Sequence, residues 1–312
     1  MAVGFLIFIL LYVCLTHREN VSPHPEPLVL QMGSCRFQLD LSVHAALYPH
    51  LQRYYCRELT SEKAWCHGPR SAPLLLLAIK SHPASRKRRA VLRRTWAQQR
   101  MMGGFWLQPV FLIGTASEDS LAQVLLQEIQ AFRDVLWWDF AESPSNHSLK
   151  ERCLLHWVHN RCQRAAYVFK ANDDIFVNPY ELTQYLRQLP RVADSIHGNL
   201  ANEEPVKRTG DAAVPCLLYP LEHYPPFIAG GTILPGAMIL KLYQVSLQLP
   251  VFPLDEAYLG FLALAANINL RHEGRFQVWG LVKDELEAYK ESITVHGVSM
   301  ERMEEVWKEL WN

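Results

Sequence analysis

Short apolar runs bounded by turn-forming residues recur through the middle of the chain and predict buried β-strands. Four segments have this pattern: 74–79, 109–114, 135–138 and 166–170. Between them the apolar residues recur at helical spacing, which predicts three helices, over 86–99, 121–132 and 149–162. Continuous apolar runs are typical of strands that are covered on both faces. The alternation of strand and helix therefore predicts an α/β fold with a parallel sheet.

An apolar run over residues 3–15 precedes a segment that contains several prolines. The run is shorter than the roughly 20 residues that an upright membrane-spanning helix needs. It therefore fits a short uncleaved anchor, the hydrophobic region of a signal peptide or a buried segment. We favour the anchor because no small-residue cleavage pattern follows; a true start upstream of Met1 would also explain the short run. The predicted organisation is a signal-anchor or transmembrane segment over 1–17, a short lumenal stem over 18–40 and one folded domain over 41–312.

The composition is that of a globular protein without bulk attraction for nucleic acid. Lys and Arg number 31, and Asp and Glu also number 31, so the formal net charge is zero. Hydrophobic residues make up 49% and charged residues 20%, which supplies an ample core and excludes a disordered chain. A nucleic-acid partner is therefore not expected.

Cysteine usage and two glycosylation sequons favour an oxidising, lumenal compartment. Of the 7 cysteines, Cys14 lies in the apolar run, and six remain: Cys35, Cys56, Cys66, Cys153, Cys162 and Cys216. They allow up to three disulfides, whose pairing the sequence leaves open. The sequons begin at Asn20 and Asn146.

The fourth predicted strand leads into a cluster of acidic and amide side chains, Asn172, Asp173 and Asp174. In open α/β sheets, ligands bind beyond the carboxyl ends of the strands. Carboxylate oxygens at such a place suit Mg²⁺ or Mn²⁺ that carries a diphosphate. The alternative is a plain turn, which these residues also favour.

Seven sequence blocks resemble, in order, those of the Golgi β-1,3-glycosyltransferases, the family of β-1,3-galactosyl- and β-1,3-N-acetylglucosaminyltransferases. The segment 170–178 is similar to their Asp-x-Asp region. The other blocks are 76–96, 111–115, 139–150, 224–231, 252–260 and 295–307. The resemblance implies a GT-A fold, Rossmann-like with a mostly parallel sheet flanked by helices. It also implies a UDP-sugar donor, Mn²⁺ and inverting transfer to a sugar hydroxyl. The implied location is the Golgi membrane, as a single-pass type II protein with a lumenal catalytic domain.

The resemblance also assigns the residues around the metal and the donor ribose. It implies that Asp174 is the direct metal ligand and that Asp173 supports the metal or the donor. Asn172 would hydrogen-bond the donor ribose. His296 is a candidate second ligand because imidazole also suits Mn²⁺. The alternative for His296 is a purely structural role.

An inverting transfer needs one base that takes the proton of the acceptor hydroxyl. The family places this carboxylate in an acidic pair, and the matching pair here is Asp255 and Glu256. In this register Glu256 is the base and Asp255 its helper. The alternative role for Asp255 is the N-cap of a helix over 257–266.

Four further side chains are candidates for binding the donor: Lys80 after the first strand, Arg89 and Arg93 on the next helix, and Asp139 after the third strand. The basic segment 86–94 could instead be a solvated helix face. The inward positions expected of this helix are Ala90, Leu92 and Trp96.

Four departures from the family pattern leave a second function open, one of them the segment 232–235, which differs from the aromatic and Ser sequence that usually follows the glycines. Asn172 stands where relatives carry Asp, Glu256 replaces an Asp, and Ile228 stands where relatives often carry Cys. We expect an active enzyme that transfers GlcNAc from UDP-GlcNAc to terminal galactose of glycoprotein or glycolipid glycans. UDP-Gal is the alternative donor, and a non-catalytic partner of another transferase is the alternative function. Homo-oligomers or hetero-oligomers with other Golgi transferases are the protein partners considered.

Overall fold

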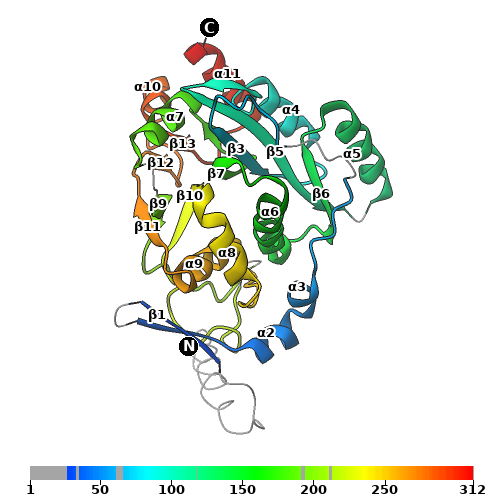
Figure 1. The fold of residues 1–312 in the computed structure, drawn as a ribbon, viewed down its shortest axis with the longest axis vertical. Coiled ribbons are helices and arrows are strands. Elements are labelled where there is room, and N and C mark those ends of the chain that lie inside the picture. The colour runs from blue at the N-terminus through cyan, green and yellow to red at the C-terminus, as the bar shows by residue number, and fades with distance from the viewer. Residues whose placement is uncertain are drawn as a thin grey trace, which may run out of the picture.

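The computed structural model describes residues 27–32, 35–60, 66–116, 118–190, 194–210 and 213–311, and the statements below concern these residues. Its centre is an eight-stranded sheet (Figure 1). The strands are β3 (Leu74–Lys80), β4 (Arg100–Met102), β5 (Phe105–Thr115), β6 (Val135–Ala141), β7 (Ala165–Asn172), β9 (Ser195–Ala201), β10 (Phe227–Pro235) and β11 (Asn269–His272). The strand order is β11-β9-β10-β7-β3-β5-β4, and β6 also pairs with β5.

The middle of the sheet is parallel, as the sequence predicts. Strands β6, β5, β3 and β7 pair in parallel, and so do β11 and β9. Strand β10 is antiparallel to both of its neighbours, and β4 is antiparallel to β5. The four predicted strands correspond to the parallel set β3, β5, β6 and β7. The predicted α/β class, with a mostly parallel sheet flanked by helices, is confirmed.

Alternate side chains of β3 enter two different cores, which explains its continuous apolar sequence. Leu74, Leu76 and Ala78 belong to one core, whereas Leu75 and Leu77 belong to the other. The first core is covered by α6 (His147–Arg161), α8 (Ile239–Ser246) and α9 (Asp255–Ala265). The second is covered by α4 (Arg86–Arg94), α5 (Asp119–Phe132), α7 (Pro179–Gln188), α10 (Leu286–Glu291) and α11 (Met300–Trp311). Two short 3-10 helices, η1 (Pro144–Asn146) and η2 (Gly236–Met238), precede α6 and α8.

An N-terminal hairpin packs beneath α9 and belongs to the folded domain (Figure 1). It consists of β1 (Leu28–Met32) and β2 (Cys35–Leu39) and is followed by α2 (Leu41–Leu47) and α3 (Pro49–Arg53). Leu30, Phe37 and Leu39 are buried in the first core, and the Phe37 ring lies 6.5 Å from that of Phe261. Residues 28–32 and 35–39, which the sequence analysis placed in the stem, therefore pack on the folded domain.

The predicted anchor over 1–17 lies outside the described residues and stays a prediction. Within the described ranges, no helix combines the length and hydropathy needed to cross a membrane. The sequon at Asn20 also lies outside them. Asn146, in contrast, is buried, and its side chain donates to the Ala141 carbonyl and pairs with His50. A glycan on Asn146 would have to break these contacts, so this sequon no longer supports a lumenal location.

Two disulfides tie the segment before β3 to α6. Cys56 pairs with Cys153, and Cys66 pairs with Cys162 at the end of the helix. Among the cysteine side chains that the structure describes, Cys216 has no disulfide partner. Two of the three allowed disulfides are therefore present, and both join segments that are nearly 100 residues apart.

Candidate functional site

The carboxyl ends of β3 and β7 meet at one edge of the sheet and bring two predicted segments together. Lys80 is the register partner of Asn172, and the Asp173 N–H donates to the Lys80 carbonyl at 3.0 Å. A cleft of about 770 Å³ opens at this edge. The polar side chains that line it include Lys80, Lys170, Asn172, Glu256 and His296, which come from four segments. The predicted position of the site, beyond the strand ends, agrees with this cleft.

A small three-stranded sheet brings the C-terminal histidine to the acidic segment. Its strands are β12 (Phe276–Gln277), β13 (Thr294–Val295) and β8 (Phe176–Val177). His296 follows β13, and its Nε2 lies 3.4 Å from Oδ2 of Asp174. The Val298 N–H donates to the Asp174 carbonyl at 3.0 Å, which holds the two segments together. The structure therefore brings the two predicted metal ligands into contact.

The chemistry of this pair fits a divalent cation. Oδ1 of Asp174 is buried without a hydrogen-bond partner, so the carboxylate has an unused acceptor. A third His, Cys, Asp or Glu at metal-binding distance is not found within the described ranges. Mg²⁺ and related cations are often held by one or two protein ligands, with substrate phosphates and water completing the shell. Asp174 and His296 could hold Mn²⁺ in this manner.

Asp173 points away from the cleft, and its carboxylate contacts Ser81 and Arg88. Its Oδ2 accepts a hydrogen bond from the Ser81 hydroxyl at 2.6 Å, and Arg88 Nε lies 3.9 Å from Oδ1. Burial raises the pKa of Asp173, and the Ser81 hydrogen bond and the Arg88 charge oppose that rise. Asp173 does not line the cleft. Its position suits support of its neighbours, Asn172 and Asp174, better than direct contact with a donor.

The acidic pair at the start of α9 is split between two environments. Asp255 is buried and bonded to Lys80, whose Nζ also lies 3.7 Å from Glu151. Burial alone would raise the pKa of Asp255, but the charges of Lys80 and Lys170 outweigh it and hold that pKa far below its usual range. Asp255 occupies the first turn of α9, where Leu254 is the N-cap residue, so the predicted N-cap role is wrong. Its carboxylate instead fixes Lys80.

Glu256 turns the other way and lines the cleft. Burial, followed by the negative charge of Asp255, raises its pKa above the ordinary glutamate value. Both carboxylates lie in the first turn of α9, where the helix dipole favours negative charge. A half-buried carboxylate with a raised pKa is suited to act as a general base.

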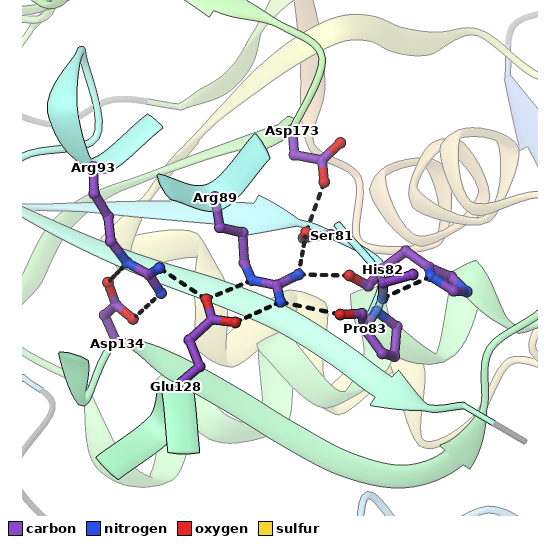
Figure 2. A network of polar contacts seen from close by, with 9 residues as sticks. Ser81, His82, Pro83, Arg89, Arg93, Glu128, Asp134 and Asp173 are labelled. Carbon is purple, nitrogen blue, oxygen red and sulfur yellow. Dashed lines mark hydrogen bonds and ion pairs between the residues drawn. The ribbon is translucent and has the colours of Figure 1, made fainter. Parts of the chain in front are cut away.

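The predicted donor ligands Arg89 and Arg93 lie inside the protein rather than in the cleft (Figure 2). Both bind the buried carboxylate of Glu128, and Arg93 also forms a two-pronged pair with Asp134. The Arg89 side chain is 0% exposed. The structure thus corrects the prediction for these two arginines, because neither guanidinium can contact a ligand in the cleft.

Asp139 is likewise outside the cleft lining. Its carboxylate accepts a hydrogen bond from the Tyr54 hydroxyl at 2.6 Å and lies 3.5 Å from Arg57. These contacts tie β6 to the segment that carries Cys56. The prediction that Asp139 binds the donor is therefore corrected: its carboxylate connects two segments of the fold and does not line the cleft.

Two charged residues at the site were not predicted from the sequence. Glu151 on α6 lies between Lys80 and Lys170, and its contact with Lys170 is 2.7 Å long. All three side chains are nearly inaccessible to solvent. The sequence feature that could have indicated Glu151 is α6, because this helix is buried on several sides and yet carries the charged residues Lys150 and Glu151. A charge in such a helix indicates a buried partner.

Comparison with known proteins gives concordant matches. A family model described as Galactosyltransferase matches residues 87–274. An acetylgalactosaminyl-O-glycosyl-glycoprotein β-1,3-N-acetylglucosaminyltransferase from Homo sapiens is 31% identical over 306 residues, covering 92% of this chain and 79% of that protein. The Mus musculus protein of the same name is 30% identical over 281 residues, covering 85% and 71%. N-acetyllactosaminide β-1,3-N-acetylglucosaminyltransferase 4 from Homo sapiens is 31% identical over 244 residues, covering 75% and 64%.

Proposed function

Because this chain belongs to the Galactosyltransferase family and is a glycosyltransferase, we propose that it forms β-1,3 linkages with UDP-GlcNAc as donor. The proposed acceptor is the 3-hydroxyl of a terminal galactose on glycoprotein or glycolipid glycans. The observation that carries the proposal is a single cleft lined both by a carboxylate with a raised pKa, Glu256, and by the candidate metal ligand His296. The printed names of the relatives support N-acetylglucosamine as the transferred sugar.

The departing nucleotide is assigned to the side of the cleft lined by His296, which contacts Asp174. When bound there, Mn²⁺ would neutralise the negative charge that develops on the leaving diphosphate. Asp174 supplies an oxygen ligand with a free lone pair, and His296 supplies a nitrogen ligand. The amide of Asn172 lines the same cleft and is suited to hydrogen-bond a ribose hydroxyl. Replacement of the usual Asp by Asn at 172 keeps this hydrogen-bonding capacity.

Glu256 is the proposed base in a single inverting displacement. It takes the proton of the acceptor hydroxyl as the oxygen attacks the anomeric carbon, on the face opposite to the leaving UDP. Its raised pKa makes it a stronger base than an exposed glutamate, while its neighbour Asp255 is occupied by Lys80. Asp255 is therefore a positioning residue, which keeps Lys80 at the wall of the cleft.

A transfer assay on the purified chain tests the proposal. The assay would offer UDP-GlcNAc, UDP-Gal, UDP-GalNAc and UDP-Glc with lactose or lacto-N-neotetraose, in Mn²⁺ or in EDTA. Mn²⁺-dependent formation of a β-1,3-linked GlcNAc product is the expected result, and Glu256→Gln is the matched inactive control. Product from UDP-Gal alone would move the donor to the alternative sugar. Absence of transfer from folded protein that binds UDP would favour the non-catalytic partner instead.

Placement in the Golgi membrane as a type II protein is also proposed. The two disulfides support an oxidising compartment, since such bonds are rare in reducing ones. Localisation of the tagged full chain, with and without residues 1–17, tests this part. Retention of the truncated chain at the same membrane would contradict the anchor.

A further inference from the structure

Arg89 is fully buried at the centre of a polar network behind the acidic segment, and all of its donors are used (Figure 2). Nε and Nη2 donate to the two carboxylate oxygens of Glu128 at 2.8 and 2.7 Å. Nη1 donates to the Ser81 hydroxyl at 3.0 Å and to the His82 carbonyl at 2.5 Å, and Nη2 also donates to the Pro83 carbonyl at 3.1 Å. A guanidinium has five N–H groups, so none is left for a ligand.

The network fixes the direction of the Ser81 hydroxyl. Arginine has no acceptor, so the Ser81 oxygen must accept from Arg89. The Ser81 proton is therefore free to point to Asp173, whose Oδ2 lies 2.6 Å away. The hydrogen bonds run in one sense, from the guanidinium through the hydroxyl to the carboxylate. Hydrogen bonds that follow one another in this way strengthen each other.

Asp173 lies in the sequence between Asn172, which is assigned to the donor ribose, and Asp174, which is assigned to the metal. Its backbone N–H is held by the Lys80 carbonyl and its side chain by Ser81, so both attach it to the end of β3. With Asp173 fixed at two points, the side chains of Asn172 and Asp174 are set toward the cleft and toward His296. Arg88, which lies 3.9 Å from Asp173, is a weaker and more exposed support.

We propose that Arg89 is a positioning residue for nucleotide binding, because through Ser81 it holds Asp173 and the turn of residues 172–174 in the orientation that UDP needs. This inference rests on the proposed function. The proposal explains why Arg89, which does not line the cleft, is bound to Ser81 as well as to the Glu128 carboxylate. A buried ion pair alone contributes little net stability relative to apolar residues.

The chain offers a matched control in Arg93, the other arginine on Glu128. Arg93 binds Glu128 and Asp134 but has no contact with Ser81. Arg89→Lys and Arg93→Lys both replace a forked donor in the same network by a point charge. Both are expected to lower the melting temperature. Only Arg89→Lys should weaken UDP binding in Mn²⁺ buffer, by roughly tenfold, the effect of one hydrogen bond to a charged group.

Ser81→Ala separates positioning from folding. This variant keeps the Arg89 contacts to Glu128 and the His82 carbonyl but removes the link to Asp173. It should weaken UDP binding about as much as Arg89→Lys, with a smaller change in melting temperature. If Ser81 acts through Asp173, adding Ser81→Ala to Asp173→Ala should weaken binding no further, because each change removes the same hydrogen bond.

The experiment measures the UDP dissociation constant by calorimetry in Mn²⁺ and in EDTA, together with thermal unfolding, for the wild type and these variants. Wild-type affinity in Ser81→Ala, or equal loss of affinity in Arg89→Lys and Arg93→Lys, overturns the positioning role alone. Full additivity of Ser81→Ala with Asp173→Ala also overturns it. A wild-type protein that does not bind UDP overturns the proposed function, and the nucleotide role of Arg89 with it.

Discussion

Replacement of Glu256 by Gln should affect catalysis and stability in opposite directions. The Glu256 carboxylate lines the cleft, and its pKa is raised by burial and by the charge of Asp255. The amide is nearly isosteric but cannot accept a proton from the acceptor hydroxyl. Loss of a positioned general base typically lowers the rate 10²- to 10⁴-fold, so kcat should fall by about that factor. In free-energy terms this is about 3–5 kcal/mol of transition-state stabilisation.

The effect on stability follows from the sign of the pKa shift. The pKa of Glu256 is higher in the folded protein than in the unfolded chain, so folding favours the protonated form. Its contribution to stability is therefore complete below the unfolded pKa and is lost as the pH rises through the folded pKa. Glu256→Gln removes that loss, because the amide does not ionise. The variant should unfold at the same or a higher temperature than the wild type near neutral pH.

Asp255→Asn is the matched comparison and should give the opposite result. Asp255 is buried and bonded to Lys80, and removal of its charge leaves the Lys80 ammonium without its closest partner. Removal of one partner from a buried pair commonly costs about 3–5 kcal/mol of folding free energy. Asp255→Asn should thus lower the melting temperature markedly, in contrast to Glu256→Gln.

Three measurements check this reasoning: initial rates at saturating donor and acceptor, thermal unfolding at several pH values, and the pH profile of kcat/KM. Since the base must be ionised, wild-type activity should rise with pH through the raised pKa of Glu256 and lie to the alkaline side of an ordinary glutamate. Activity of Glu256→Gln within threefold of wild type would refute the assignment of the base. A lower melting temperature for Glu256→Gln would refute the claim that burial disfavours the charged form of Glu256.

Three further predictions follow from the site and the disulfides. Asp174→Asn and His296→Ala should each weaken UDP binding in Mn²⁺ and leave the weak binding in EDTA unchanged, as measured by calorimetry. Cys153→Ala removes a disulfide that spans 97 residues and should lower the free energy of unfolding by about 2–5 kcal/mol in denaturant titrations. Trp279 lines the cleft and is 90% exposed, so Trp279→Ala should raise the KM for the acceptor several-fold at unchanged donor KM. An unchanged acceptor KM would exclude sugar stacking on this ring.

The parallel part of the sheet could be read from the sequence because its strands are buried on both faces. The β3 run from Leu74 to Ile79 has no polar residue, and this leaves little choice but a central strand. In contrast, β9 contains Ser195, His197 and Gly198 and lacks such a run. It pairs with β10 and β11, so its strand character depends on neighbours distant in sequence. Tertiary context of this kind is absent from local patterns.

The proximity of the strand-end residues could be predicted because the parallel topology alone brings them together. Because β3 and β7 are parallel neighbours, Lys80 lies beside Asn172 independently of the structure of the loops. The roles within the acidic pair could not be read in the same manner. Asp255 and Glu256 are adjacent in sequence, and only the packing of α9 against Lys80 decides which carboxylate is occupied and which faces the cleft.

The inward direction of Arg89 was nevertheless encoded in the helix period. Arg89 and Leu92 are spaced as i and i+3 on α4, which places the arginine on the same stripe as a fully buried apolar side chain. On the following helix, Glu128 stands three residues after the buried Leu125 and is itself buried. Burial of a single charge in an apolar stripe is energetically unfavourable. A positive charge in one buried stripe and a negative charge in the next are therefore expected to form an ion pair with each other. Charges should therefore be assigned to a face by their register with apolar neighbours before a basic run is read as a ligand cradle.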